Sequence, residues 1–123
     1  MICIRITERE DGLELSAHGH AGYAPQGQDV VCAGVSALLY GFIAYLEGLP
    51  PIATGEAQVG DINHLEVSDE DGILTVRTNG MGGADRNGLA VIQEGLGLIA
   101  SCYPAFVMLD THAHKKGDEY ESN

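Results

Sequence analysis

The sequence predicts an α+β fold, a two-layer domain in which a mixed or antiparallel sheet of two hairpins carries two helices on one face. Two observations lead to this prediction. Short segments of alternating apolar and polar residues occur in two pairs, and each pair precedes a longer segment with apolar residues at helical spacing. The 123 residues suffice for a single domain, which we place at residues 1–110, followed by a polar tail at 111–123 that we expect to be disordered.

The first hairpin is predicted over residues 2–8 and 13–20, joined by a turn at Asp11-Gly12. Apolar residues of its second strand share one face, namely Leu13, Leu15 and Ala17. The opposite face carries both His18 and His20. Because the two histidines point away from the apolar face, we do not expect a core role for either.

A helix is predicted to follow the loop at residues 22–28, which is rich in Gly, Pro and Gln. Asp29 suits the N-cap position, and this places Cys32 near the third helical residue. Apolar residues then recur close to the helical period at Val31, Val35, Leu38, Leu39, Phe42 and Leu46. Gly48 and a Pro-Pro pair end the helix, whereas Gly34 and Gly41 inside it predict close packing against a neighbouring backbone.

The second half repeats this order after an irregular connection at residues 52–61. Strands are predicted at 63–68 and 73–78, joined by an acidic turn at 69–72. A glycine-rich turn leads to a second helix at 85–102, whose buried stripe consists of Leu89, Ile92, Leu96 and Ile99. A short last strand is predicted at 106–109. The polar tail after it contains His112 and His114.

Charge and cysteine content narrow the partners and the compartment. The 6 basic and 18 acidic residues give a net charge of −12, which disfavours direct nucleic-acid binding and favours a basic peptide or protein partner. The three cysteines, without a C-x-x-C pair, do not form a disulfide framework. The start MICIRITERE lacks a signal-peptide layout, and no apolar run approaches membrane length. We therefore expect a reducing, cytoplasmic location and no membrane partner.

Cys32 and His20 are the leading candidates for chemistry. Eleven residues separate them, enough for a loop to fold back and bring the imidazole to the sulfur. The first turn of a helix has unpaired backbone N–H groups and the positive end of the dipole, and both favour a thiolate. A histidine within reach can take the thiol proton and later give it to a leaving group. Backbone N–H groups at the helix start are also the natural donors to an oxyanion.

Other candidate residues have a structural alternative. Asp29 is the best candidate for a supporting role, either as the helix cap or by holding the imidazolium. Ser36 lies one helical turn after Cys32 and could hydrogen-bond a substrate, although a packing contact is equally consistent. A metal site would combine His18, His20 and Cys32 with a fourth ligand from His64, His112 or His114. None of these residues has a recognised zinc spacing, and we predict neither a metal nor a cofactor.

The string GHAGYA-x-x-G-x-DVVCAGVSAL at residues 19–38 resembles the signature of the ribosomal-processing cysteine protease family, called Prp. The strand–strand–helix order fits this family over nearly the whole chain. The resemblance implies a bacterial, cytoplasmic cysteine protease that is usually homodimeric. Its members remove a short N-terminal extension from a large-subunit ribosomal protein by cutting after an aromatic residue.

Position by position, the resemblance also implies roles for individual residues. Cys32 matches the nucleophile, His20 matches the general acid/base, and Ser36 falls where the family has a serine near the substrate cleft. Residues 22–28 match the loop that closes over bound peptide, which makes Gly22 and Gly27 candidates for substrate binding. The alternative function is a non-catalytic ribosome-assembly or peptide-binding factor of the same fold, for which a reactive Cys32 would be unnecessary.

Overall fold

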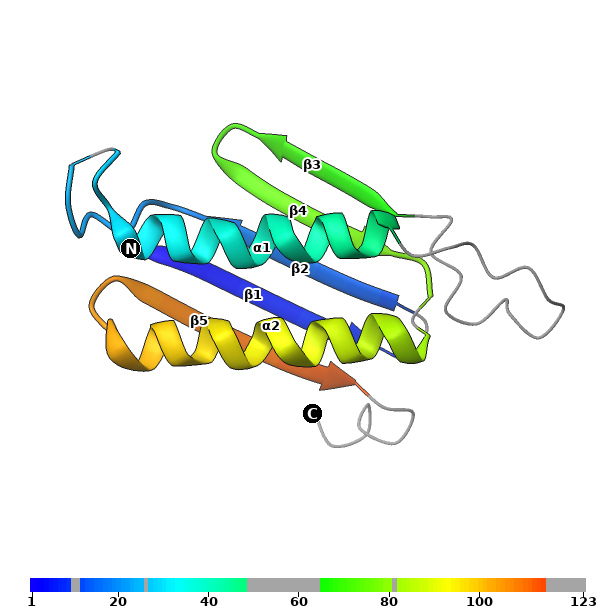
Figure 1. Cartoon of the computed structure of the whole chain (residues 1–123). Coiled ribbons are helices and arrows are strands. Elements are labelled where there is room, and N and C mark those ends of the chain that lie inside the picture. Colours follow the sequence, from blue (N-terminus) through cyan, green and yellow to red (C-terminus); the bar gives the residue numbers. More distant parts are fainter. Residues whose placement is uncertain (10–11, 26, 49–64, 81, 115–123) are drawn as a thin grey trace, which may run out of the picture.

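The computed structural model describes residues 1–9, 12–25, 27–48, 65–80 and 82–114. Seven elements follow one another along the chain (Figure 1): β1 (Ile2–Arg9), β2 (Gly12–His18), α1 (Val30–Gly48), β3 (Glu66–Glu70), β4 (Ile73–Thr78), α2 (Gly83–Cys102) and β5 (Val107–His114). The predicted order of two hairpins, each followed by a helix, is confirmed.

The five strands form one mixed sheet in the order β3-β4-β2-β1-β5. All neighbours pair antiparallel except β1 and β5, which are parallel. The first hairpin is therefore central, and the β4 strand of the second hairpin pairs with β2. In this register His18 lies beside Cys3 on one side and Ile73 on the other.

Both helices cover the same face of the sheet and run side by side in opposite directions (Figure 1). Glycines of α2 allow this close approach, because a Cβ at Gly88 would lie 2.5 Å from the Tyr45 ring and one at Gly95 would lie 3.0 Å from Leu38. The packing against a neighbouring backbone predicted for Gly34 and Gly41 is not seen among the described residues. No described atom outside the local helix lies within 4 Å of the position that a Cβ on Gly41 would take, and a Cβ on Gly34 would contact the side chain of Ile99.

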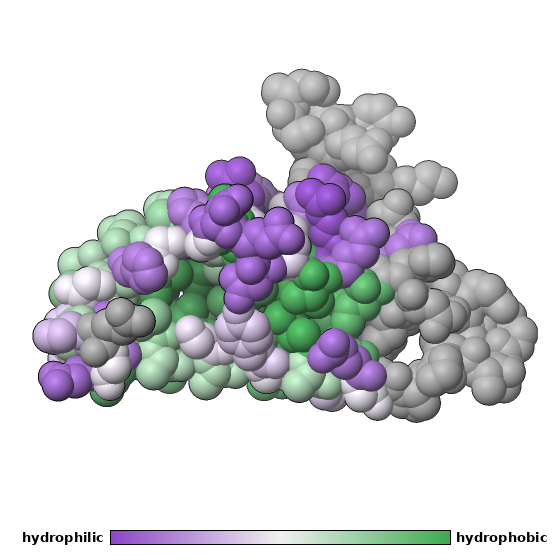
Figure 2. Space-filling model, turned by 90° about the horizontal axis from the view of Figure 1, so that it is seen from above, coloured by the Kyte–Doolittle hydropathy of each residue, from purple (hydrophilic) through white to green (hydrophobic). Residues whose placement is uncertain are grey.

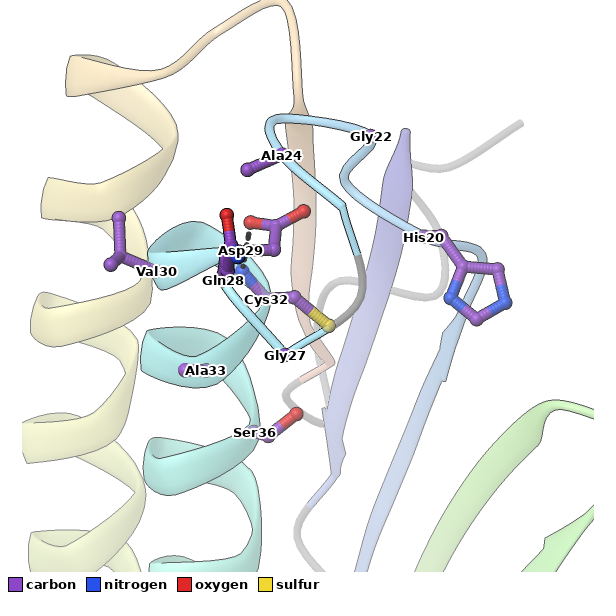
Figure 3. Close-up of a pocket in the computed structure, with 10 residues that line it drawn as sticks. All are labelled: His20, Gly22, Ala24, Gly27, Gln28, Asp29, Val30, Cys32, Ala33 and Ser36. Carbon is purple, nitrogen blue, oxygen red and sulfur yellow. Dashed lines mark hydrogen bonds between the residues drawn. The ribbon is translucent and has the colours of Figure 1, made fainter.

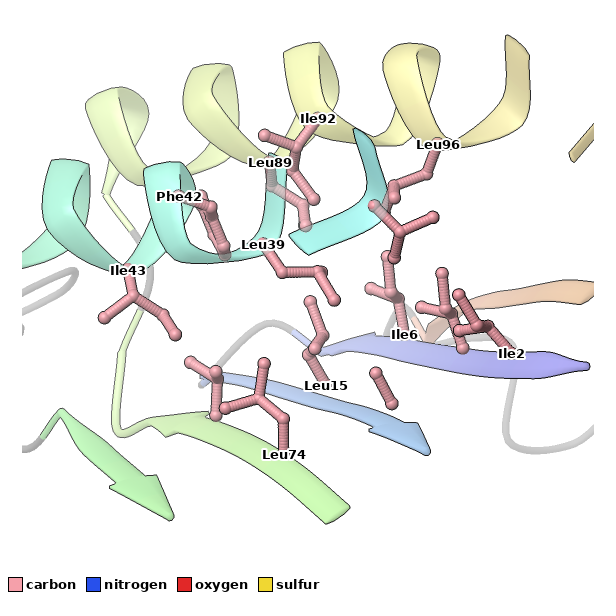
Figure 4. Packing of buried hydrophobic residues seen from close by; sticks show 14 of the residues in the cluster. Ile2, Ile6, Leu15, Leu39, Phe42, Ile43, Leu74, Leu89, Ile92 and Leu96 are labelled. Carbon is pink, nitrogen blue, oxygen red and sulfur yellow. The ribbon is translucent and has the colours of Figure 1, made fainter. Parts of the chain in front are cut away.

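The hydrophobic core lies between the sheet and the two helices (Figure 4). Alternation along β1 and β2 points Ile4, Ile6 and Leu15 toward the helices, where their exposure is 1% or less. Helix α1 is long and apolar enough to cross a membrane, although no such run was expected from the sequence. Six of its side chains are nevertheless buried in this core: Val31, Val35, Leu39, Phe42, Ile43 and Leu46.

Several predicted boundaries are corrected by the structure. The last strand runs from Val107 to His114, so residues 111–114 belong to the sheet and not to a polar tail. Parallel pairing with β1 along its whole length accounts for this, since each β1 residue from Ile2 to Arg9 has a partner on β5. Strand β2 ends at His18, two residues early, and β3 begins at Glu66. The irregular connection at 52–61 and the residues from 115 onward lie outside the described residues.

Replacing Leu96 with alanine is expected to destabilise the domain by about 2–5 kcal/mol, because its fully buried side chain would leave a cavity between α2 and the sheet. Urea unfolding would measure the change. Leu98→Ala on the same helix is the matched control, since Leu98 is 66% exposed and its loss should cost less than about 0.5 kcal/mol. Equal effects of the two changes would contradict the assignment of the buried face.

Candidate active site

A pocket of about 660 Å³ opens where the loop after β2 meets the start of α1 (Figure 3). Ten residues line it: His20, Gly22, Ala24, Gly27, Gln28, Asp29, Val30, Cys32, Ala33 and Ser36. All six residues that the sequence suggested for a site are among them. The structure thus brings these residues to one place, which is the first condition for the roles predicted for them.

Asp29 is the N-cap of α1, as predicted. Its Oδ1 accepts a hydrogen bond of 2.9 Å from the N–H of Cys32, and its backbone carbonyl accepts the first helical bond from Ala33 at 3.0 Å. The other carboxylate oxygen, Oδ2, accepts a 3.1 Å bond from the N–H of Tyr23 in the loop. One carboxylate therefore ties the loop to the helix start and holds Cys32 at the third position of the helix.

These bonds lower the pKa of Asp29 below its usual value of 3.8. The hydrogen bond from the N–H of Cys32 lowers the pKa most, because it stabilises the charged carboxylate. Desolvation raises the pKa and so opposes this effect. The N–H groups of Tyr23, Ala24 and Val31 lower the pKa further. The cap also affects one expected role of the helix start. Backbone N–H groups near Cys32 were expected to donate to an oxyanion, and the N–H of Cys32 itself donates to Asp29 in this structure.

His20 lies in the same pocket but does not contact Cys32. Its imidazole points away from the Cys32 sulfur in Figure 3, and no hydrogen bond between described residues joins the two. The chain geometry explains this arrangement, because β2 ends at His18 and Gly19 then turns the backbone with a φ of +97°. A Cβ on Gly19 would lie 2.2 Å from the carbonyl oxygen of Met1, so glycine is needed there.

The loop over the pocket has an aromatic anchor that sequence reasoning missed. Tyr23 packs edge-on against Tyr103 and Phe106, which lie between α2 and β5, with ring centroids 5.5 and 5.3 Å apart. On either side of it, Gly22 and Gly27 have φ values of +70° and +89° and open space around them. An aromatic residue in a glycine-rich loop could have suggested such an anchor from the sequence. Its partners could not be predicted, because they are about 80 residues away along the chain.

Ser36 is exposed one turn after Cys32, and its side chain lies on the same side of α1 in Figure 3.

The metal alternative is not supported, because the described residues contain no group of three or more His, Cys, Asp or Glu side chains that could hold an ion. His18, the second strand histidine, lies on the sheet face away from the helices, beside Cys3. Cys3, Cys32 and Cys102 are all free thiols.

Comparisons with known proteins point to one family. A family model described as cysteine protease Prp matches residues 1–107. The ribosomal processing cysteine protease Prp of Mycoplasma pneumoniae is 29% identical over 97 residues, which cover 79% of this chain and 85% of that protein. The protein of the same name from Staphylococcus aureus is 36% identical over 81 residues, which cover 64% and 71% of the two chains.

Solved structures share the fold. The S. aureus ribosomal processing protease Prp in complex with a covalently linked product peptide superposes with a TM-score of 0.73, at 23% identity, over 90% of this chain and 99% of that one. The same protease with a substrate peptide gives a TM-score of 0.64 at the same identity and coverage. A protein from Streptococcus mutans gives 0.63 at 24% identity, over 93% and 96%.

The cap bonds of Asp29 predict a pH-dependent contribution to stability. The pKa of Asp29 is lower in the folded state than in the unfolded state. The cap therefore contributes its full stabilisation at a pH above the unfolded-state pKa, and this stabilisation is lost as the pH falls through the folded-state pKa. We expect Asp29→Ala to unfold at lower urea than wild type at pH 7, and the difference to narrow toward pH 3. Asp29→Asn, which keeps a capping side chain without its charge, should differ less from wild type at pH 7. A difference of constant size between pH 7 and pH 3 would contradict this account.

Proposed function

This chain belongs to the Prp family of cysteine proteases, and we propose that it is a cysteine endopeptidase that removes the N-terminal extension of a large-subunit ribosomal protein. The observation that carries the proposal is the shared pocket of His20 and Cys32, with Cys32 in the first turn of α1. These are the two positions that match the histidine and cysteine of the family pattern. The relatives from M. pneumoniae and S. aureus carry ribosomal processing in their names, and peptide-bound structures share the fold.

In the proposed reaction, the thiolate of Cys32 attacks the scissile carbonyl carbon and forms a C–S bond. His20 holds the proton from the thiol as an imidazolium and gives it to the leaving amine when the C–N bond breaks. Water, deprotonated by the same histidine, then attacks the acyl-enzyme, and the thiol leaves with the proton. The dipole of α1 supports negative charge at Cys32 throughout.

This reaction requires two changes from the structure described above. The imidazole of His20 must turn toward the sulfur, which is consistent with catalytic hydrogen bonds that form only when substrate is bound. Any use of the Cys32 N–H as an oxyanion donor requires its bond to Asp29 to break. Both changes involve the loop between His20 and Asp29. The contact of Tyr23 with Tyr103 and the hydrogen bond between Tyr23 and Asp29 hold this loop in place, so a movement of the loop would accompany both.

The pocket and the surface charge suit a peptide substrate. A volume of about 660 Å³ accommodates a few side chains, within the range of typical ligand sites. The net charge of −12 favours a basic ribosomal protein and disfavours direct contact with nucleic acid. We extend the proposal to a cytoplasmic homodimer without a metal or cofactor, in keeping with the family resemblance.

A second candidate is a peptide-binding or ribosome-assembly factor without catalysis. The observation that favours it is the orientation of His20, whose ring points away from the thiol. The two candidates differ in the reactivity of Cys32. A binding factor needs no reactive thiol, so its Cys32 should alkylate no faster than Cys3 or Cys102.

Cys32→Ala is expected to abolish cleavage of a peptide that spans the junction between the N-terminal extension and the mature ribosomal protein. In the proposed reaction the thiolate of Cys32 is the nucleophile that attacks the peptide bond, so no acyl-enzyme can form without it. Mass spectrometry of the products would place the cut, which we expect after an aromatic residue. Cys102→Ala, an exposed thiol at the end of α2, serves as the control and should cleave like wild type.

Cleavage by Cys32→Ala would contradict the assignment of the nucleophile. No cleavage by wild type, together with slow alkylation of Cys32, would favour the binding factor. Rapid alkylation of Cys32 without cleavage would instead indicate an active thiol offered the wrong peptide.

His20→Ala is expected to lower kcat/KM for the same peptide by at least about 100-fold, the usual contribution of a general acid/base. His18→Ala is the matched control, because His18 is an exposed histidine two residues earlier that lies on the far face of the sheet. Its activity should stay within about twofold of wild type. Similar losses in both variants would argue for a structural effect at the end of β2 and against catalysis by His20.

A further inference from the structure

The side of α1 that bears Cys32 continues beyond the pocket. Gly34 and Leu38 contact α2, which defines the side of α1 that faces the other helix. Cys32, Ser36 and Tyr40 follow one another at intervals of four residues on the opposite side. This side of α1 therefore carries the nucleophile, the pocket serine and an exposed tyrosine in one row.

The row faces the outer strand of the sheet. Every residue of β3 is exposed, and in Figure 1 neither helix lies over this strand. The hydroxyl of Tyr40 donates a hydrogen bond to Oδ2 of Asp69 on β3, so the two side chains span the space between α1 and the sheet edge. Seen from this edge, hydrophobic surface lies between hydrophilic side chains (Figure 2). An extended peptide that leaves the pocket along α1 would reach this bridge.

The separation along α1 gives the substrate position that reaches it. Eight residues of helix, from Cys32 to Tyr40, rise by about 12 Å. An extended peptide advances about 3.3 Å per residue, so the bridge lies roughly three or four residues from the scissile bond. A side chain at that distance can contact Asp69 while the reacting carbonyl lies at Cys32.

The chemistry of the bridge favours a positively charged partner. Three arginines form ion pairs with carboxylates on β1, β2 and β5: Arg5 with Asp110, Arg77 with Glu14, and Arg86 with Glu8. No described arginine or histidine forms an ion pair with Asp69, and only its Oδ2 is engaged by Tyr40. Among the residues that the structure describes, the carboxylate thus has one oxygen left to accept a hydrogen bond and no cation to balance its charge.

We propose that Tyr40 and Asp69 form a distal subsite that selects a lysine or arginine three or four residues from the scissile bond of the substrate. Tyr40 is the positioning residue, because its hydroxyl fixes the carboxylate beside the path along α1. The inference rests on the proposed function, in which Cys32 attacks a peptide bond held in this pocket. It adds to that function a carboxylate, Asp69, that distinguishes peptides with a positive charge at this position from peptides without one.

The test uses junction peptides with alanine at the third and fourth positions on both sides of the scissile bond, and four variants with one lysine each. For wild type at low ionic strength, lysine at one of these positions should raise kcat/KM about two- to fivefold over alanine, as a partly exposed ion pair would. In Asp69→Asn this ratio should fall to about one. Glu70→Gln is the matched control, because it removes the same charge one residue later, where strand alternation places the side chain on the other face.

A lysine preference that is absent in wild type, retained in Asp69→Asn, or lost equally in Glu70→Gln would overturn the subsite. The same peptides would also be titrated by fluorescence anisotropy into Cys32→Ala, with and without Asp69→Asn, so that the subsite is tested independently of cleavage. A preference in Kd without any cleavage by wild type would support the subsite and count against the protease. Cleavage without a preference would do the reverse, and no binding by any of these peptides would overturn the subsite.

Discussion

The two hydrogen bonds accepted by the Asp29 carboxylate are the constraint on which the candidate site depends. One bond closes the first turn of α1 at Cys32, and the other holds the loop at Tyr23. An N-cap normally satisfies only the helix start. Here the same side chain also fixes the loop that connects His20 to the helix start, so the stability of the helix end and the position of the loop cannot vary independently.

The two-layer core provides the frame for this constraint. Helix α1 is held from below by the sheet and from one side by α2, whose glycines allow close contact with Tyr45 and Leu38. The side of α1 with Cys32 and Ser36 lies next to the outer strand, and there Cys32 is half-buried and Ser36 is exposed. In the proposed reaction a substrate can therefore approach Cys32 without any rearrangement of the core, and only the loop and the imidazole need to move.

Local features of the fold could be predicted from the sequence, whereas long-range ones could not. Periodicity placed both helices and β4 within two residues of their observed bounds, and Asp29 was correctly predicted as the cap. Periodicity does not reveal strand pairing, so the parallel contact of β1 with β5 and the strand residues up to His114 were missed. Spacing and resemblance selected candidate residues that the structure places in one pocket. They did not predict the direction of the His20 ring or the positive φ of Gly19, where a Cβ would clash with the carbonyl oxygen of Met1. The Tyr40–Asp69 bridge joins residues 29 apart and had no local signal.

The parallel pairing of β1 with β5 has a consequence for biosynthesis. Strand β1 completes its hydrogen bonding only with β5, which is synthesised after all the other described elements, since Ile2 pairs with Val107 and Arg9 with His114. The segment between α2 and β5 supplies Tyr103 and Phe106, against which the pocket loop packs. A nascent chain that still lacks these residues and β5 has neither a complete sheet nor a support for the loop. Assembly of the pocket is therefore expected to be late, after β5 and the segment before it have left the exit tunnel.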